Sequence, residues 1–146
     1  MVRHAQTVPG VGDPPGFRIG DCSTQRNLSE QGRAQARRLG VAFQARGIAP
    51  ARVLSSQWCR CIDTATEAFG RQTPEPALNS FFDDRGSEVA QSAATRKLIA
   101  GVKRGEVLVL VTHQVNITAQ GGQGVGMGDL IVLSRDGKPL GRLPAP

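Results

Sequence analysis

The stretch EVLVLVT at residues 106–112 decides the fold of this chain of 146 residues. From Val107 to Val111 it is an unbroken apolar run with no polar residue in between. Strands at the centre of a parallel sheet have this composition, because helices cover both of their faces. We therefore predict a central parallel strand here, which ends just before His113.

Upstream of this strand, the segment 28–47 (LSEQGRAQARRLGVAFQARG) has the pattern of an amphipathic helix. Ser29 is a candidate N-cap, Glu30 complements the helix dipole in the first turn, and Gly47 fits the C-terminal stop. Apolar or small residues recur at the i, i+3, i+4 spacing of a buried helix face. They are Ala36, Leu39, Phe43 and Gly47.

Strands and helices alternate along the rest of the chain. In chain order we predict a strand at 51–56, a helix at 57–70, an extended segment at 77–82, a helix at 87–100 with the apolar line Ala94, Leu98 and Val102, a helical turn at 114–120 and a strand at 129–134. This order is typical of one α/β domain over residues 1–146, a three-layer α/β/α sandwich with a mostly parallel central sheet. Two glycine-rich segments, 8–27 and 121–129, are predicted to be a long surface loop and a flexible connector.

The net charge of the chain is +6, and arginine supplies most of it, since lysine occurs only at Lys97, Lys103 and Lys138. The planar guanidinium group pairs well with phosphate or carboxylate, so this bias suits an anionic partner, although a GC-rich genome would produce the same bias. We expect no nucleic-acid partner, because no basic run is interleaved with aromatic residues and tyrosine is absent. No apolar run approaches eighteen residues, so we expect no membrane span. The oligomeric state stays open.

The start of the sequence bears on the cellular location. Arg3 and His4 are followed by a stretch rich in glycine and proline, and not by the apolar segment of a signal peptide. The sequence as it stands therefore predicts a cytoplasmic protein. An export signal upstream of Met1 would instead make the protein periplasmic.

The three cysteines are Cys22, Cys59 and Cys61. An odd number argues against a complete disulfide framework, although one bridge is compatible with it. Cys59 and Cys61 are not expected to bind zinc, because on a helix their side chains point to nearly opposite sides and no histidine lies at ligand spacing. We expect neither a metal ion nor a cofactor.

Polar residues follow each predicted strand. Because ligands of such sheets bind beyond the carboxyl ends of the strands, we expect these side chains to meet in one crevice. Two imidazoles and two guanidiniums around a pocket suit a tetrahedral dianion, since arginine holds the oxygens while an imidazole attacks phosphorus or neutralises charge. In chain order the residues are Arg3 and His4, then Ser55, Ser56 and Arg60, then Asp83 and Asp84, and finally His113.

Four motifs occur in order along the chain: RHAQT at 3–7, LSEQGRAQA at 28–36, SSQWCRCIDTA at 55–65 and VLVTH at 109–113. Together they resemble the motifs of the histidine phosphatase superfamily, which has the phosphoglycerate-mutase-like fold, and the resemblance covers nearly the whole chain. The segments GDPPGFRIGDCSTQRNLSE and SFFDDR are similar to small single-domain bacterial members, including those that dephosphorylate lipopolysaccharide core sugars.

The resemblance implies roles for individual residues. His4 would be the nucleophile that forms a phosphohistidine, for which its ring must be neutral. Arg3, Arg60 and His113 would line the phosphate pocket and stabilise charge on the transferring group. Two further candidates for phosphate contacts are Asn27, which could equally be a loop or helix-entry residue, and Gln114, through its backbone N–H.

A leaving oxygen needs a proton, which the superfamily usually supplies from a glutamate two residues after a leucine at the end of the third strand. Ser80 has that place here. Asp83 or Asp84 is therefore the nearest candidate acid, and a raised pKa would be required of it. Either aspartate could equally be a helix-entry or loop residue.

The first strand is unusually short. Only Met1 and Val2 precede Arg3, whereas strands typically run about five or six residues. Either upstream residues are missing, which we expect, or the sheet tolerates a short first strand. Without upstream residues we expect His4 to be poorly anchored and activity to be weak.

The sequence thus predicts a metal-independent phosphatase that hydrolyses a small or sugar-like phosphomonoester through a phosphohistidine on His4. Two alternatives stay open. The small size is compatible with removal of phosphohistidine from a signalling protein. Ser80 and the short first strand are compatible with a degenerate, non-catalytic phosphate-binding module.

Overall fold

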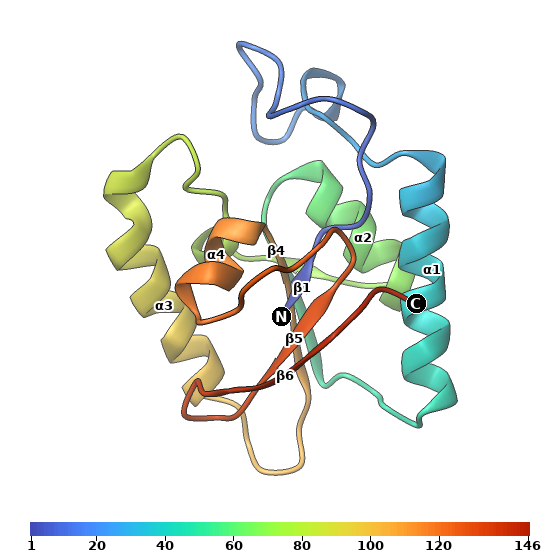
Figure 1. The fold of residues 1–146 in the computed structure, drawn as a ribbon, viewed down its shortest axis with the longest axis vertical. Coiled ribbons are helices and arrows are strands. Elements are labelled where there is room, and N and C mark those ends of the chain that lie inside the picture. The colour runs from blue at the N-terminus through green and yellow to red at the C-terminus, as the bar shows by residue number, and fades with distance from the viewer.

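A computed structural model describes residues 1–146 as a six-stranded sheet in the order β3-β2-β4-β1-β5-β6 (Figure 1). The strands are β1 (Val2–Arg3), β2 (Arg52–Ser55), β3 (Thr73–Pro74), β4 (Leu108–Thr112), β5 (Leu130–Leu133) and β6 (Pro139–Leu143). The helices are α1 (Glu30–Ala45), α2 (Cys59–Phe69), α3 (Glu88–Ala100) and α4 (Gln114–Ala119), with 3-10 turns η1 (Cys22–Thr24), η2 (Pro76–Leu78) and η3 (Arg85–Ser87). None of the helices combines the length and the apolar character needed to cross a membrane.

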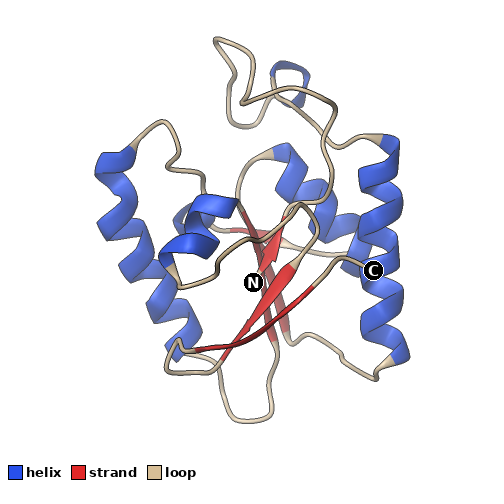
Figure 2. Ribbon diagram, in the orientation of Figure 1, coloured by secondary structure: helices blue, strands red, loops and turns tan.

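The predicted central strand is confirmed. β4 pairs in parallel with β2 on one side and with β1 on the other, and β2 pairs in parallel with β3. β5 and β6 are antiparallel, so the sheet is mostly parallel as expected. Because helices lie on both sides of the sheet, α1 and α2 on one and α3 and α4 on the other, the three-layer arrangement is also confirmed (Figure 2).

The two faces of β4 explain its unbroken apolar run. Val109 and Val111 pack in a cluster with residues of α1 and α2. Leu110 packs on the opposite face with Ile99 of α3 and Ile117 of α4. Both faces of the strand therefore meet a helix layer, and its one polar side chain, Thr112, is buried with its hydroxyl donating to the Leu78 carbonyl at 2.7 Å.

The predicted helix at 28–47 is confirmed as α1. The Ser29 hydroxyl accepts a hydrogen bond from the Gly32 N–H as N-cap, and Gly47 has a φ of +64° just beyond the helix end. α1 packs closely on α2, because a Cβ at Gly40 would lie only 2.0 Å from the carbonyl oxygen of Ala68. Glycine is thus required where these two helices meet.

The extended segment predicted at 77–82 is wrong. η2 occupies its start, and β3 lies earlier, between the predicted helix at 57–70 and this segment. Leu78 and Phe81 are fully buried, so their apolar character reflects packing and not strand pairing. Pro74 is compatible with β3 because β3 is an edge strand, where a missing N–H donor is tolerated.

The buried face of α3 also differs from the prediction, in which Ala94, Leu98 and Val102 formed the apolar line. Its buried residues are Ser92, Thr95 and Ile99. The Thr95 hydroxyl donates to the Ala77 carbonyl at 3.1 Å, so this polar side chain is buried with a partner. Hydrophobicity alone could not identify such a face.

β6 was not predicted. All of its residues are exposed, and it pairs only with β5 at the edge of the sheet. A strand with both faces largely open to solvent needs no apolar alternation, and Pro139 and Gly141 are poor strand formers. The sequence therefore holds no signal for it.

Candidate active site

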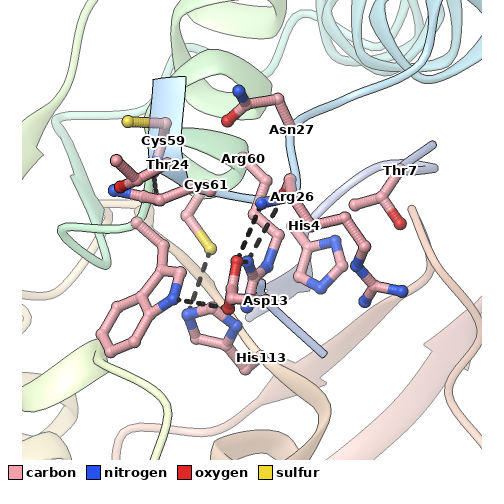
Figure 3. Close-up of polar contacts among 12 residues, drawn as sticks. His4, Thr7, Asp13, Thr24, Arg26, Asn27, Cys59, Arg60, Cys61 and His113 are labelled. Atoms are coloured by element: carbon pink, nitrogen blue, oxygen red, sulfur yellow. Dashed lines mark hydrogen bonds and ion pairs between the residues drawn. The ribbon is translucent and has the colours of Figure 1, made fainter. Parts of the chain in front are cut away.

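The carboxyl ends of the inner parallel strands meet at one edge of the sheet. β1 is followed by His4, β2 by Ser56 and β4 by His113. The ring centroids of His4 and His113 are 5.5 Å apart, with an angle of 65° between the ring planes. Figure 3 shows both rings beside Arg60 and Asp13. The structure thus brings together the two histidines that the sequence placed in one crevice.

His4 is held firmly although β1 is short. Its N–H donates to the Thr112 carbonyl of β4 at 2.9 Å, and its carbonyl accepts from the Gly128 N–H at 3.0 Å. The expectation that a short strand would leave His4 poorly anchored is therefore wrong. The connector 121–129, predicted to be flexible, supplies part of this support.

A buried threonine of α2 links the His4 segment to Arg60. The Thr64 hydroxyl accepts from the Ala5 N–H at 2.9 Å and donates to the Arg60 carbonyl at 2.6 Å. Thr64 is fully buried, so water does not compete for these bonds. The spacing of four residues between Arg60 and Thr64 thus fixes the arginine and the nucleophile segment relative to each other.

The His4 ring is prepared for nucleophilic attack. Its Nδ1 lies 2.9 Å from the Ala5 carbonyl, which can only accept, so Nδ1 carries the proton and Nε2 keeps its lone pair. Burial is the main cause that lowers the pKa of His4 to about 3, and the charges of Arg60, Arg3 and Arg26 lower it further, against the opposing bond to Ala5. At neutral pH the ring is uncharged, as a nucleophile must be.

His113 caps the start of α4 and lies deep in the same site. Its Nε2 is 2.8 Å from the Ser56 hydroxyl and 3.5 Å from the Cys61 sulfur, and Trp58 packs edge-on against the ring at 5.3 Å. Burial is the main cause that lowers the pKa of His113 well below its ordinary value, and the nearby His4 and arginines add to it. A bound anion would favour the protonated ring, in which both nitrogens donate.

The two buried histidines predict a loss of stability in mild acid. Their folded pKa values lie below the unfolded value of 6.5. As the pH falls below that value, the unfolded chain binds protons that the folded protein does not, so the free energy of unfolding decreases. The loss approaches about 1.4 kcal/mol per pH unit for each histidine. Urea denaturation at about pH 7.5, 6 and 5 measures it, above the range in which carboxyl groups titrate.

The control for this pH effect is His4→Asn, which removes one of the two groups. Its urea midpoint should depend on pH less steeply than that of the wild type. A wild-type midpoint that stays constant from about pH 7.5 to 5 would contradict two neutral buried imidazoles.

Three guanidinium groups converge on the imidazoles. Arg3 and Arg60 were predicted, whereas Arg26 of the loop 8–27 was not. Burial, followed by the charge of Arg26, lowers the pKa of Arg3, and burial followed by Arg60 lowers that of Arg26, so the three charges lie close together. Each has a buried Nε–H without a hydrogen-bond partner. An unpaired buried donor costs roughly 1–3 kcal/mol, so three of them suit an anion with several oxygens.

Asp13, which no sequence motif marks, also lies in this cluster. Its side chain is 8% exposed. Oδ1 accepts from Arg60 Nη1 at 2.7 Å and from the Arg26 N–H at 2.9 Å, and Oδ2 accepts from Trp58 Nε1 at 3.0 Å. Burial raises the pKa of Asp13, but these bonds outweigh it and hold the pKa below its ordinary value. In the sequence Asp13 looks like an ordinary turn residue, because it stands in GDPPG.

The remaining predicted site residues lie at the margin. Asn27 donates its amide N–H to the Cys22 carbonyl at 2.7 Å, which closes the loop, and its Oδ1 is buried without a partner. Gln114 is the first residue of α4 and its side chain is exposed. Phosphate contacts of both residues stay predictions.

Asp83 and Asp84, the candidate acids, are exposed in the segment before α3. The Asp84 carbonyl accepts from the N–H and the hydroxyl of Ser87, which is a helix-entry role. The Ser80 hydroxyl accepts only from the nearby Phe82 N–H, at 3.3 Å. No ion pair or hydrogen bond joins either aspartate to the histidines or the arginines of the site.

The loop 8–27 is fastened over the start of α2 (Figure 1). Cys22 and Cys59 form a disulfide, so the one compatible bridge is present. The ring of Phe17 packs 5.5 Å from that of Trp58. These links hold the segment that carries Asp13 and Arg26 against the site.

Cys61 is the free cysteine, and it is completely buried. Burial raises the pKa of its thiol to about 12, so the thiol stays protonated. No three histidine, cysteine or acidic side chains lie together in a way that could hold a metal ion.

A model of the histidine phosphatase superfamily (branch 1) matches residues 1–86, which is more than half of the chain and includes His4 and Arg60. The chain belongs to the histidine phosphatase superfamily. The family suggested by the four motifs is thus confirmed. A search of curated protein sequences gave no match.

Solved structures of the superfamily share the fold over nearly the full length. SixA from Agrobacterium tumefaciens, assigned as a phosphohistidine phosphatase, is 26% identical, with a TM-score of 0.69 over 99% of this chain and 95% of that chain. A SixA protein histidine phosphatase in complex with tungstate is 17% identical, with a TM-score of 0.64 over 97% and 93%. A mycobacterial glucosyl-3-phosphoglycerate phosphatase is 20% identical, with a TM-score of 0.58 over 98% and 94%.

Proposed function

We propose that this member of the superfamily is a phosphatase that hydrolyses phosphomonoesters through a phosphohistidine on His4, without a metal ion, and that its substrate is a small or sugar-like phosphate. One observation carries the proposal: a neutral imidazole with a free Nε2 lone pair lies among three guanidinium groups whose Nε–H donors are buried and unpaired. Such a cluster attracts a phosphate dianion and stabilises the charge of its transition state.

Each residue has its own role in the phosphoryl transfer. His4 Nε2 attacks phosphorus, while the Nε–H groups of Arg3, Arg26 and Arg60 donate to the phosphoryl oxygens. His113, once protonated beside the anion, donates to the same group. Water then attacks the phosphohistidine and releases inorganic phosphate.

Trapping the intermediate tests this proposal. Protein mixed with an aryl phosphate in the presence of a chelator should, after an alkaline quench, carry one phosphoryl group, because phosphohistidine survives base and is lost in acid. Peptide mass spectrometry should place the group on His4. A phosphoryl group on another residue, or turnover that stops with the chelator, would exclude this mechanism.

A second candidate substrate is a protein phosphohistidine, which the similarity to Agrobacterium SixA favours. The two candidates differ in kcat/KM for a phosphohistidine peptide and for sugar phosphates, measured side by side. Tight tungstate binding with no turnover of either substrate would instead favour a non-catalytic phosphate-binding module.

We also propose that the protein works in an oxidising compartment, the periplasm. The disulfide between Cys22 and Cys59 supports this, because such bridges persist there and are rare in the reducing cytoplasm.

Removing this disulfide is expected to lower the free energy of unfolding by about 3–4 kcal/mol, because the bridge closes a loop of 37 residues and so restricts the unfolded chain. The double variant Cys22→Ser/Cys59→Ser, compared with the wild type in urea, measures the loss. Thiol titration of unreduced, denatured wild-type protein should find Cys61 alone. Reactivity of all three cysteines before reduction would contradict the bridge.

A further inference from the structure

We propose that Asp13 is the general acid and base of this site: it protonates the leaving oxygen as His4 attacks phosphorus, and then takes a proton from the water that hydrolyses the phosphohistidine. This inference rests on the phosphatase function proposed above. It gives the site a proton donor. Ser80 has no carboxyl group to fill this role, and neither Asp83 nor Asp84 contacts the cluster.

Contact with the anion-binding arginines is the first argument. Asp13 is the one carboxylate that bonds Arg60, and both side chains are nearly inaccessible to solvent, at 8% and 6% exposed. Figure 3 shows Asp13 bonded to Arg60, within the group of side chains that includes His4 and His113. The ion pair therefore places Asp13 next to an arginine that we propose holds the phosphate.

The way in which Arg60 is used is the second argument. Its Nη1 donates to Asp13, while its Nε–H has no partner in the protein. A phosphate oxygen that accepts from the Nε–H therefore shares one planar guanidinium group with the Asp13 carboxylate. Substrate binding does not require that Asp13 leave, and it places the ester next to Asp13.

Charge is the third argument. The charged groups that face Asp13 are Arg60 of α2 and Arg26 of its own loop, and they keep the carboxyl group ionised before substrate binds. A phosphate dianion partly neutralises both arginines and adds a like charge beside Asp13. Both effects favour the protonated carboxyl group, so Asp13 takes up a proton from solvent as the substrate binds and then serves as the acid.

The two steps balance. In the first, the bond between His4 Nε2 and phosphorus forms, the bond from phosphorus to the ester oxygen breaks, and that oxygen takes the Asp13 proton and leaves as an alcohol. In the second, Asp13 takes a proton from water as the water oxygen bonds to phosphorus, and the bond to His4 breaks. The products are one alcohol and one inorganic phosphate, and Asp13 is again protonated.

The fold holds Asp13 as a proton-transfer group requires. The disulfide between Cys22 and Cys59 and the bridge between Thr7 and Leu28 fasten the loop, and Trp58 Nε1 fixes Oδ2 at 3.0 Å. Proton transfer contributes only when the acid is held at hydrogen-bond distance in a fixed direction.

The test is the variant Asp13→Asn, assayed with two substrates whose leaving groups differ in basicity. For glycerol 1-phosphate, whose alkoxide must be protonated, kcat/KM should fall on the order of 10²–10⁴-fold. For p-nitrophenyl phosphate, whose phenolate leaves without a proton, kcat/KM should stay within about tenfold of the wild type. With p-nitrophenyl phosphate the kcat of the variant should fall, because hydrolysis of the phosphohistidine lacks its general base. A burst of nitrophenol should appear, and phosphohistidine should accumulate.

A control and a second variant make the outcome decisive. Asp21→Asn, on the same loop, should behave as the wild type, because the side chain of Asp21 is partly exposed and pairs with Arg18, outside the cluster. Asp13→Glu, which keeps a carboxyl group, should recover part of the activity on glycerol 1-phosphate relative to p-nitrophenyl phosphate. This comparison stands even if the asparagine variant does not fold.

Several results would overturn the inference. Equal losses of kcat/KM on both substrates would show that Asp13 only positions Arg60. The same leaving-group dependence in Asp83→Asn or Asp84→Asn, with none in Asp13→Asn, would give the role to another aspartate. Failure of the proposed function looks different, since wild-type protein would then form no phosphohistidine and turn over neither substrate.

Discussion

Replacement of His4 by alanine is expected to lower kcat/KM for p-nitrophenyl phosphate on the order of 10⁴-fold or more, because the variant lacks the imidazole whose Nε2 is free to attack phosphorus, whereas Nε2 of His113 is engaged by Ser56. The buried thiol of Cys61 has a pKa of about 12 and cannot replace His4 at neutral pH. The measurement is the steady-state rate with and without chelator, together with the phosphohistidine trap. The variant should give no trapped phosphoryl group.

The control for His4→Ala is the fold of the variant. The near-ultraviolet circular dichroism of Trp58, the sole tryptophan, reports on the site, because its ring packs against His113. A variant with the wild-type spectrum and undiminished turnover would remove the phosphohistidine mechanism. The wild-type protein itself should turn over p-nitrophenyl phosphate at the same rate with and without chelator.

Arg60→Ala is expected to lower both activity and stability. The loss of one donor to the transferring phosphoryl group should reduce kcat/KM on the order of 10²–10³-fold. The free energy of unfolding should fall by about 3–5 kcal/mol, because Asp13 would be left as a buried carboxylate without its cation. Kinetics with p-nitrophenyl phosphate and urea denaturation measure the two losses separately.

A double variant separates the two effects of Arg60. In Arg60→Met/Asp13→Asn no buried charge is left unpaired, so much of the stability should return while activity stays low. Arg37→Ala is the matched surface control: its pair with Glu67 is half exposed, and its loss should cost less than about 1 kcal/mol and leave turnover unchanged. A kcat/KM of Arg60→Ala equal to that of the wild type would show that Arg60 only pairs with Asp13 and does not stabilise the phosphoryl group.

Most of the fold could be predicted because its signals are local. The apolar run of β4, the capping of α1 by Ser29 and the alternation of strands and helices each depend on residues close together in the chain. The segment 77–82 and the buried face of α3 could not be predicted in this way. Leu78 is buried without strand pairing, and Thr95 is buried by a hydrogen bond, so neither follows the usual link between hydrophobicity and structure.

Some residues of the candidate site could likewise be predicted from the sequence, and others could not. His4 and His113 could be placed together because parallel strands end at one edge of the sheet, and Arg60 because it follows such a strand at the start of a helix. Asp13 and Arg26 could not, since they come from an irregular loop whose course no periodicity describes. Asp13 meets Arg60 across a separation of 47 residues.

The sequence by itself determined the α/β class, the superfamily and the strand ends that carry the two imidazoles, because periodic burial and short motifs depend on neighbouring residues. Only the tertiary structure decided that Cys22 pairs with Cys59, that His4 is held by β4 and the glycine-rich connector, and that a loop carboxylate lies among the arginines. Those contacts join distant segments, and their geometry exists only once the sheet, the helices and the loop have packed together.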